Sequence, residues 1–419
     1  DDCFVLEKAI HGLPEAGRRF YQTYAALVMK FTHNGVKMKR LKVDPCVFVW
    51  RSKGIILIIC LHVDDTKIAT NRPRMKDLFI KHLRVTKNWD VHEVGKINYF
   101  LSLSYKQDLK NGTVQMNQKG QVQAILDSHE IVFPKDMPFV PSVELAPNED
   151  QATQNTIDEC RSLLGKIIYL LWTYPELSFI ISKVASLVTN PSDQVRKILY
   201  VQILGYLRKT ISWHCIQYSK AACYTGGPTC DPALHADGRI KDCGVSVFKI
   251  QCFVDAEFGL RCKKTSRSRG GTALMMVNGP IYVNSKVQPI AAASTQEAEY
   301  IQMETGRRMI QFVISFLEEL EFKQDAPVDM FEDNAAAARL ATSLTTNTRS
   351  KHILLRCHII RDEAIEFKKI QMWLTPGMWQ LADITTKQVG RVIWIRFVKI
   401  LLGLVIKDFR EESDLIDTK

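Results

Sequence analysis

The sequence contains no apolar run long enough to span a membrane. A membrane-spanning helix needs about 20 consecutive apolar residues, whereas the most apolar short run, residues 55–61, has seven. The later stretch 392–406 is also rich in apolar residues, but it contains Arg396 and Lys399. It is therefore predicted to form an amphipathic helix, and no membrane segment is predicted.

Cysteine pairs with the Cys-x-x-Cys spacing are also absent, and the total of 11 cysteines is odd. A disulfide framework is therefore not expected, and neither is a zinc site on the loosely spaced Cys223, Cys230, Cys243 and Cys252. No secretory signal peptide is visible, and the chain begins with Asp1, which is typical of an internal piece of a longer product. We expect a reducing, intracellular location, either cytoplasmic or nuclear.

An excess of acidic residues is lacking as well. Lys and Arg number 56 against 45 Asp and Glu, which gives a net charge of +11 and a pI near 9.0. A basic balance suits a polyanionic partner such as nucleic acid, although many basic proteins bind none. The length of 419 residues predicts two or three domains.

The sequence does contain a pair of adjacent acids, Asp64 and Asp65, directly after the apolar strand predicted for residues 55–63. A second strand is predicted at 67–70, so the two acids would lie at the tip of a hairpin. Carboxylates that end a buried strand are costly unless they bind a positive charge, and hard divalent cations prefer carboxylate oxygens. Asp is also common in surface turns, and the spacing alone leaves both interpretations open.

Apolar periodicity predicts further elements along the chain. The predicted helices cover residues 16–31, 74–90, 121–130, 161–172, 177–189, 195–209, 295–320 and 350–367, with one more beginning at 335. The predicted strands cover residues 47–50, 99–105, 113–117, 252–257, 271–277, 279–284, 287–292, 328–332 and 371–374. Residues 135–155 are predicted to be a linker, and residues 218–250 are predicted to be irregular.

Short motifs follow one another in a characteristic order along the chain. They are Leu6-Glu7-Lys8-Ala9-Ile10-His11-Gly12-Leu13 with Ala16, Arg18 and Tyr21, Asp44-Pro45-Cys46, Leu61-His62-Val63-Asp64-Asp65, Tyr99-Phe100-Leu101, Leu164-Gly165-Lys166, Val254-Asp255-Ala256, Ser294-Thr295-Gln296-Glu297-Ala298-Glu299-Tyr300, Asp333-Asn334, Ser350-Lys351-His352-Ile353 and Gln380-Leu381-Ala382-Asp383-Ile384. In this order and spacing they resemble the reverse transcriptase and ribonuclease H part of the Pol polyprotein of copia-type retrotransposons. The resemblance covers almost the whole sequence.

The resemblance implies a fold class and a division of the chain. Residues 1–134 would be an α+β reverse transcriptase palm remnant that lacks the fingers and the first catalytic strand. Residues 135–250 would contain a linker, a helical thumb and connection, and an irregular insertion. Residues 251–390 would form an α/β ribonuclease H-like domain with a mixed sheet flanked by helices, and residues 391–419 a C-terminal amphipathic helix and tail.

In the polymerase half, the resemblance implies that Asp64 and Asp65 are catalytic acids that bind Mg²⁺ or Mn²⁺. Two such ions activate the primer hydroxyl and stabilise the leaving pyrophosphate. The third metal-binding Asp of the family belongs to a strand that would precede residue 1. We therefore expect RNA-directed DNA polymerase activity to be lost through truncation.

In the ribonuclease H half, the resemblance implies that Asp255, Glu299, Asp333 and Asp383 are the catalytic, metal-binding acids. Such a site hydrolyses the RNA strand of an RNA–DNA hybrid with two Mg²⁺ (or Mn²⁺) ions. Asp255 is predicted to end a strand, Glu299 to lie early in a long helix, Asp333 to follow a strand and Asp383 to open the final helix. Each acid also has a structural interpretation, either as a solvated helix residue or as a helix N-cap.

The candidates for contacts to nucleic acid are basic residues from three segments. They are Arg18 in the first motif, Lys263, Lys264 and Arg267 in a basic cluster with Arg261 and Arg269, and Lys351 and His352 in a predicted helix with Arg361. These side chains could contact phosphates. They could equally be solvated loop residues and the basic face of a half-buried helix.

The sequence departs from the family's pattern close to two of the acids. Glu257 and Phe258 stand where the family has Asp and Trp, and Ala335 and Ala336 stand where it has Gln and Ser. The leading hypothesis is a metal-dependent ribonuclease H-type endonuclease that acts on RNA–DNA hybrids. The alternative is a catalytically inactive, nucleic-acid-binding remnant of a transposable element. No oligomeric state is predicted.

Overall fold

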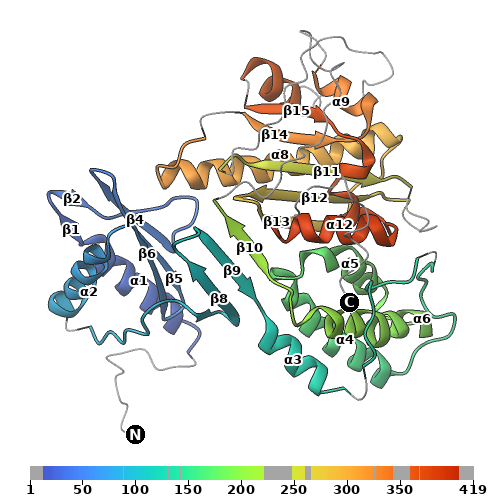
Figure 1. The fold of residues 1–419 in the computed structure, drawn as a ribbon, viewed down its shortest axis with the longest axis horizontal. Helices are drawn as coiled ribbons and strands as arrows, with labels where there is room; N and C mark the ends of the chain where they lie inside the picture. The colour runs from blue at the N-terminus through green and yellow to red at the C-terminus, as the bar shows by residue number, and fades with distance from the viewer. Residues whose placement is uncertain are drawn as a thin grey trace, which may run out of the picture. The chain divides into compact units, whose positions relative to one another are not determined.

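The computed structural model describes residues 13–87, 89–129, 132–141, 143–220, 248–259, 266–324, 327–342, 359–367 and 369–404. They belong to two compact units that both mix helices and strands (Figure 1). Unit 1 consists of Asp1–Ile97 and Gln311–Gln324, and unit 2 of Asn98–Ile310 and Asp325–Lys419. The domain boundaries predicted after residues 134, 250 and 390 stay predictions. No helix in the described ranges is both long enough and apolar enough to cross a membrane.

Unit 1 is built on a four-stranded antiparallel sheet with the strand order β3-β4-β5-β6. Its elements are α1 (Ala16–Met29), β1 (Thr32–His33), β2 (Val36–Lys37), β3 (Lys39–Arg40), β4 (Val47–Ser52), β5 (Ile55–His62), β6 (Asp65–Thr70) and α2 (Pro73–Lys87). Lys53 and Gly54 connect β4 to β5 with φ angles of 48° and 75°, a conformation that glycine adopts without steric cost. Val63 and Asp64 connect β5 to β6, so the predicted acid-tipped hairpin is present.

Apolar side chains cover both faces of this sheet, which explains why the run in β5 does not alternate with polar residues. On one face, Leu57 packs with residues of α1 and α2. On the other face, Ile56 and Ile58 pack against Leu320, which comes from the segment 311–324. Unit 1 therefore needs a segment from far along the chain to cover its second face.

Polar contacts also fix this segment, which contains the last turns of α8 (Thr295–Glu319). Glu319 Oε2 accepts a hydrogen bond from the backbone N–H of Lys42 at 2.5 Å. Arg51 Nη1 donates a hydrogen bond to the backbone oxygen of Glu321 at 2.7 Å. Helix α8 thus begins in unit 2 and ends as part of unit 1.

The first part of unit 2 joins a second antiparallel sheet, with the order β10-β9-β8-β7, to a group of helices. Its elements are β7 (Tyr99–Phe100), β8 (Leu103–Asp108), β9 (Thr113–Asn117), α3 (Lys119–Asp127), α4 (Gln154–Tyr169), η1 (Leu170–Trp172), η2 (Pro175–Leu177), α5 (Ser178–Leu187), α6 (Asp193–Lys197), the π-helical η3 (Ile198–Ile203), α7 (Leu204–Thr210) and β10 (Ile216–Ser219). The helices bury one hydrophobic core that continues onto one face of the next sheet.

That next sheet is five-stranded and mixed, with the order β13-β12-β11-β14-β15 (Figure 1). The elements of this part are β11 (Gln251–Glu257), β12 (Arg269–Met276), β13 (Gly279–Val287), α8, β14 (Val328–Glu332), α9 (Ala335–Thr342), η6 (Asp362–Glu366), β15 (Ile370–Leu374), η7 (Gly377–Trp379), α11 (Asp383–Thr386) and α12 (Arg391–Leu401). β11 is antiparallel to β12 and parallel to β14, and β14 is parallel to β15. Phe253 shares the core with α11 and α12, whereas its neighbour Val254 lies on the other face against Gly306 of α8.

Two consecutive glycines of β12 allow the helices α8 and α11 to approach the five-stranded sheet closely. A Cβ atom at Gly270 would overlap the side chain of Gln302 in α8, and one at Gly271 would overlap the side chain of Thr385 in α11. Successive residues of a strand point to opposite faces, so each glycine admits one helix. Both helices are thereby brought next to β11, which pairs with β12.

Several predicted elements are wrong in detail. The strand predicted at 99–105 is interrupted because Leu101 and Ser102 have φ angles of 51° and 60°, which separates β7 from β8. β13 is one strand, and in the described chain no separate strand exists at 287–292. Asp383 opens the one-turn helix α11 and not the final helix α12. The helix predicted at 350–367 lies largely outside the described residues.

Candidate metal centre

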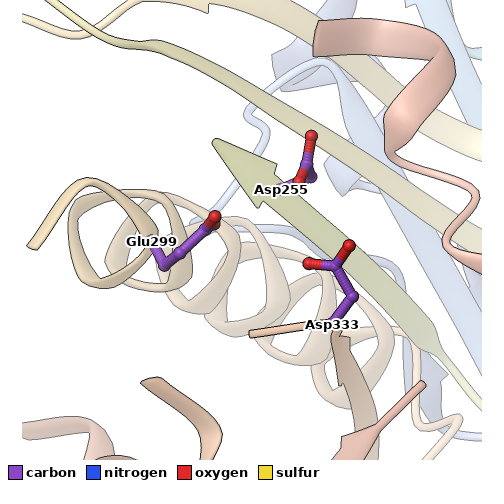
Figure 2. Close-up of side chains that lie close together, drawn as sticks. All are labelled: Asp255, Glu299 and Asp333. Atoms are coloured by element: carbon purple, nitrogen blue, oxygen red, sulfur yellow. The ribbon is translucent and has the colours of Figure 1, made fainter. Parts of the chain in front are cut away.

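Three acids of unit 2 meet where β11, α8 and the end of β14 come together. One carboxylate oxygen from each of Asp255, Glu299 and Asp333 lies within 4.8 Å of the other two. Figure 2 shows the three side chains converging from these three elements. Asp255 and Asp333 lie near the carboxyl ends of two parallel neighbouring strands, which places them at one edge of the sheet.

Asp255 and Glu299 are buried, each with 3% of its surface exposed. Thr386 Oγ1 donates a hydrogen bond to Asp255 Oδ2. Glu299 Oε2 is buried and has no hydrogen-bond partner among the described residues. The interpretation of Glu299 as a solvated helix residue is therefore wrong. A buried carboxylate oxygen without a partner is costly unless a cation satisfies it.

Asp333 is half-buried directly after β14, and its neighbour takes the role of the helix cap. Asn334 Oδ1 accepts hydrogen bonds from the backbone N–H groups of Ala336 at 3.0 Å and Ala337 at 3.1 Å. The N-cap interpretation thus applies to Asn334 and leaves the Asp333 carboxylate for another role. On the other side of Asp333, Glu332 is fully buried.

Asp383 is connected to this group through a lysine. Lys387 Nζ lies 2.8 Å from Asp383 Oδ1 and 3.9 Å from Asp255 Oδ1. Among the described residues, Asp383 is not part of the three-acid group. The structure thus brings three of the four predicted acids together directly and links the fourth to Asp255 through Lys387.

Burial and like charges make the group electrostatically unfavourable on its own. Burial, followed by the charges of Glu332, Asp255 and Asp333, raises the pKa of Glu299 to about 11. Burial and then the charge of Asp255 raise the pKa of Asp383 to about 7, against the opposing effect of Lys387. The same two causes raise the pKa of Asp333.

The three-acid group has the chemistry of a divalent-cation site. Its donors are carboxylate oxygens, which hard cations such as Mg²⁺ prefer. The unpartnered Oε2 of Glu299 and the mutual repulsion of the acids are both features that a bound cation would relieve. Asp255, Glu299 and Asp333 could therefore hold such an ion between them.

Comparison with curated proteins relates most of the chain to retrovirus-related Pol polyproteins of transposons. It is 25% identical over 396 residues, 94% of the chain, to the retrovirus-related Pol polyprotein from transposon RE1 of Arabidopsis thaliana. It is 26% identical over 404 residues, 92% of the chain, to the retrovirus-related Pol polyprotein from transposon TNT 1-94 of Nicotiana tabacum. The chain is related to the Pol polyproteins of copia-type retrotransposons.

A third Pol polyprotein, from transposon RE2 of Arabidopsis thaliana, is 26% identical over 399 residues, again 94% of the chain. The chain spans about a quarter of the length of these polyproteins, 24% for RE1 and RE2 and 27% for TNT 1-94. No protein-family model matches the chain, and no solved structure matches it.

The other acid pair of this Pol-related chain, Asp64 and Asp65, lies in a different environment. Both side chains are exposed at the tip of the β5–β6 hairpin in unit 1. Within the described residues, neither belongs to a group of three or more potential ligands. The metal-binding role predicted for the pair stays a prediction.

The predicted nucleic-acid contacts fall into three classes. Arg18 on α1 and Arg267 before β12 are exposed and accessible. Arg269 and Arg361, which were candidates beside them, are buried at 2% and 4% exposure, and Arg269 donates a hydrogen bond to Ser182 Oγ at 2.6 Å. The proposal that these two contact phosphates is wrong. The remaining candidates, Lys263, Lys264, Lys351 and His352, lie outside the described residues.

Sequence reasoning missed three residues beside the acids. Lys387 follows Asp383 by four positions, a spacing typical of ion pairs at a helix, so it could have been found. Glu332 was detectable as the immediate neighbour of Asp333. Thr386 carried no signal, because its hydrogen bond to Asp255 joins residues that are 131 positions apart.

Proposed function

We propose that unit 2 contains a ribonuclease H-type endonuclease site that hydrolyses the RNA strand of an RNA–DNA hybrid with Mg²⁺ or Mn²⁺. The observation that carries the proposal is the convergence of Asp255, Glu299 and Asp333 at one edge of a five-stranded mixed sheet. Relationship to retrotransposon Pol polyproteins supports a nucleic-acid substrate, as does the net charge of +11.

The roles of the residues follow from their positions. A divalent cation, when bound, would polarise the phosphodiester and lower the pKa of a water molecule. Asp255 and Glu299 are the most buried ligands, so they would fix the position of that ion. Asp333 is half-buried, so substrate would approach from its side. Thr386 would orient Asp255 through their hydrogen bond, in the way that outer residues orient metal ligands.

We further propose that unit 1 is related to a polymerase palm. The support is an antiparallel sheet with two helices and a hairpin that carries Asp64 and Asp65 at its tip. The described part of unit 1 offers no third acid that joins these two. We therefore expect this chain alone to extend no primer, and measurable extension of a primer on an RNA template would contradict that.

Cleavage of an RNA–DNA hybrid tests the proposed nuclease. The purified full chain is incubated with a labelled hybrid and Mg²⁺, next to Asp333→Asn and the control Asp158→Asn, which changes an exposed acid on α4. We expect the wild type and Asp158→Asn to cleave the RNA strand and Asp333→Asn to be inactive. Cleavage of the RNA strand is also expected to stop when the cation is removed with a chelator.

If neither the wild type nor the control cleaves the hybrid, the proposed activity is wrong. Hybrid binding that weakens steeply with salt would then favour the non-catalytic remnant. The alanines at 335 and 336, which replace polar residues of the family beside Asp333, are the feature that favours this second function.

A further inference from the structure

The four predicted acids do not share one environment. Asp255, Glu299 and Asp333 have oxygens within 4.8 Å of one another. Asp383 instead has Oδ1 only 2.8 Å from Lys387 Nζ. Asp255 takes part in both arrangements, because its Oδ1 lies 3.9 Å from the same nitrogen. A positive charge that belongs to the chain therefore already lies between the fourth acid and the three-acid group.

We infer that the Lys387 ammonium replaces one of two metal ions, so that the site holds a single divalent cation on Asp255, Glu299 and Asp333. This inference rests on the proposed function, in which a metal performs the hydrolysis. Two metals in a shared site lie about 3.5–4 Å apart. Asp255 would hold the single ion with Glu299 and Asp333, and the Lys387 nitrogen is the cation between Asp255 and Asp383.

The surroundings of Lys387 support this role. Its side chain is 42% exposed, whereas those of Asp255 and Asp383 are 4% and 9% exposed, so the ammonium is held at the border of a buried acidic site. A lysine ammonium is charged at neutral pH, so Lys387 brings a positive charge to Asp383 and Asp255.

The open ligand position lies with the other acids. Glu299 Oε2 is unpartnered and buried, and Glu299 is 3% exposed. Glu299 belongs to the three-acid group with Asp255 and Asp333. Lys387 thus offsets negative charge at Asp383 and Asp255, and Glu299 Oε2 is left as the oxygen that a cation would satisfy.

Manganese binding to the full chain tests the inference without relying on catalysis. Titration calorimetry gives the number of bound Mn²⁺ ions, and electron paramagnetic resonance distinguishes an isolated Mn²⁺ from a magnetically coupled pair. We expect the wild type to bind one isolated Mn²⁺. Lys387→Met removes the charge but keeps the stem, so it should bind two coupled ions, the first about tenfold more tightly than the wild type does.

Two further variants make the result specific. Lys387→Arg keeps the positive charge and should bind one ion, and Lys197→Met, an exposed lysine on α6, should behave like the wild type. If Lys387→Met does not fold, Lys387→Met with Asp383→Asn removes both partner charges and should again bind one ion. Two Mn²⁺ in the wild type, or one in a folded Lys387→Met, would overturn the inference.

Failure of the proposed function is distinguishable from failure of this inference. One isolated Mn²⁺ in a wild type that cleaves no hybrid supports the inference and contradicts the nuclease. Two Mn²⁺ in a wild type that cleaves hybrid leaves the nuclease intact and overturns the role of Lys387. A wild type that binds no Mn²⁺ contradicts both.

Discussion

The chain carries two groups of acids that differ in almost every physical respect. Asp64 and Asp65 are adjacent in sequence, exposed and located at a hairpin tip in unit 1. Asp255, Glu299 and Asp333 are scattered over nearly 80 residues, and they converge from three elements of unit 2. The adjacent pair is exposed to water, whereas two of the three dispersed acids are buried and the third is half-buried.

The difference matters because exposure sets what a carboxylate needs. An exposed carboxylate is satisfied by water and gains little from a cation, but a buried group of like charges is unstable until something neutralises it. The exposed pair is therefore satisfied by water, whereas the dispersed group needs a neutralising positive charge. Three experiments sharpen this contrast.

The largest effect is expected for metal binding. Glu299→Gln removes a carboxylate oxygen that has no other partner. Mutation of a residue that only contacts a metal ligand lowers metal affinity roughly 10–100-fold, so loss of the ligand itself should lower Mn²⁺ affinity by more than that. Asp64→Asn should leave the affinity unchanged. Titration calorimetry on both variants measures this directly.

The matched control for that experiment is Glu318→Gln, which makes the same chemical change at an exposed position of the same helix. It should bind Mn²⁺ as the wild type does. Equal losses in Glu299→Gln and Asp64→Asn would contradict the division between the two acid groups.

The next effect concerns the stability of unit 1. Leu320→Ala leaves a cavity against β5 and should destabilise unit 1 by about 2–5 kcal/mol, because Leu320 is buried. Phe312→Ala, at an exposed position of the same segment 311–324, should change the free energy of unfolding by less than about 0.5 kcal/mol. Denaturant unfolding measures both values. A parallel loss of Mn²⁺ affinity in Leu320→Ala would show that the two units are not independent.

The last effect concerns pH. The folded-state pKa values of Glu299, about 11, and Asp383, about 7, lie above ordinary carboxyl values. The folded state then holds protons that the unfolded state has lost, so the contribution of these two groups to stability is fully present below about pH 4 and is lost as pH rises through those values. Each such carboxyl contributes a loss of roughly 1.4 kcal/mol per pH unit.

Thermal melts of the metal-free chain between pH 5 and pH 8 measure this slope. The melting temperature should decrease with pH, and Mn²⁺ should restore it at pH 8, because deprotonated ligands bind the ion. Glu299→Gln should flatten the slope, whereas Asp64→Asn should not. A melting temperature that rises with pH would contradict the prediction that buried Glu299 and Asp383 set the pH dependence of stability.

The sequence predicted the main hairpin and the three converging acids because each rests on a local pattern or a motif. The acid-tipped hairpin follows from an apolar run and a turn, and Asp333 follows a strand that apolar residues define. Predictions failed where a long-range contact overrode the local pattern. Arg361 has the charge of a surface residue, but it is buried and donates to the backbone oxygen of Leu340.

Other features could not be predicted because they depend on tertiary approach. Gly271 opened the predicted strand and Gly270 lay just outside it, but in the structure each of them admits a helix against the sheet. The prediction placed Asp383 at the start of the final helix, because no strong local sequence signal separates α11 from α12. The assignment of residues 311–324 to unit 1 had no sequence signal, since a helix carries no mark of which partner it meets.

That assignment has a consequence for the order in which the protein is made. The ribosome releases residues 13–97 early, but the apolar side chains on the second face of their sheet find Leu320 only after more than two hundred further residues. At about 5–20 residues per second, the delay is roughly 10–50 s. During this interval Ile56 and Ile58 remain uncovered. The nascent chain therefore exposes an apolar surface to which a chaperone or a neighbouring chain can bind before the segment 311–324 covers it.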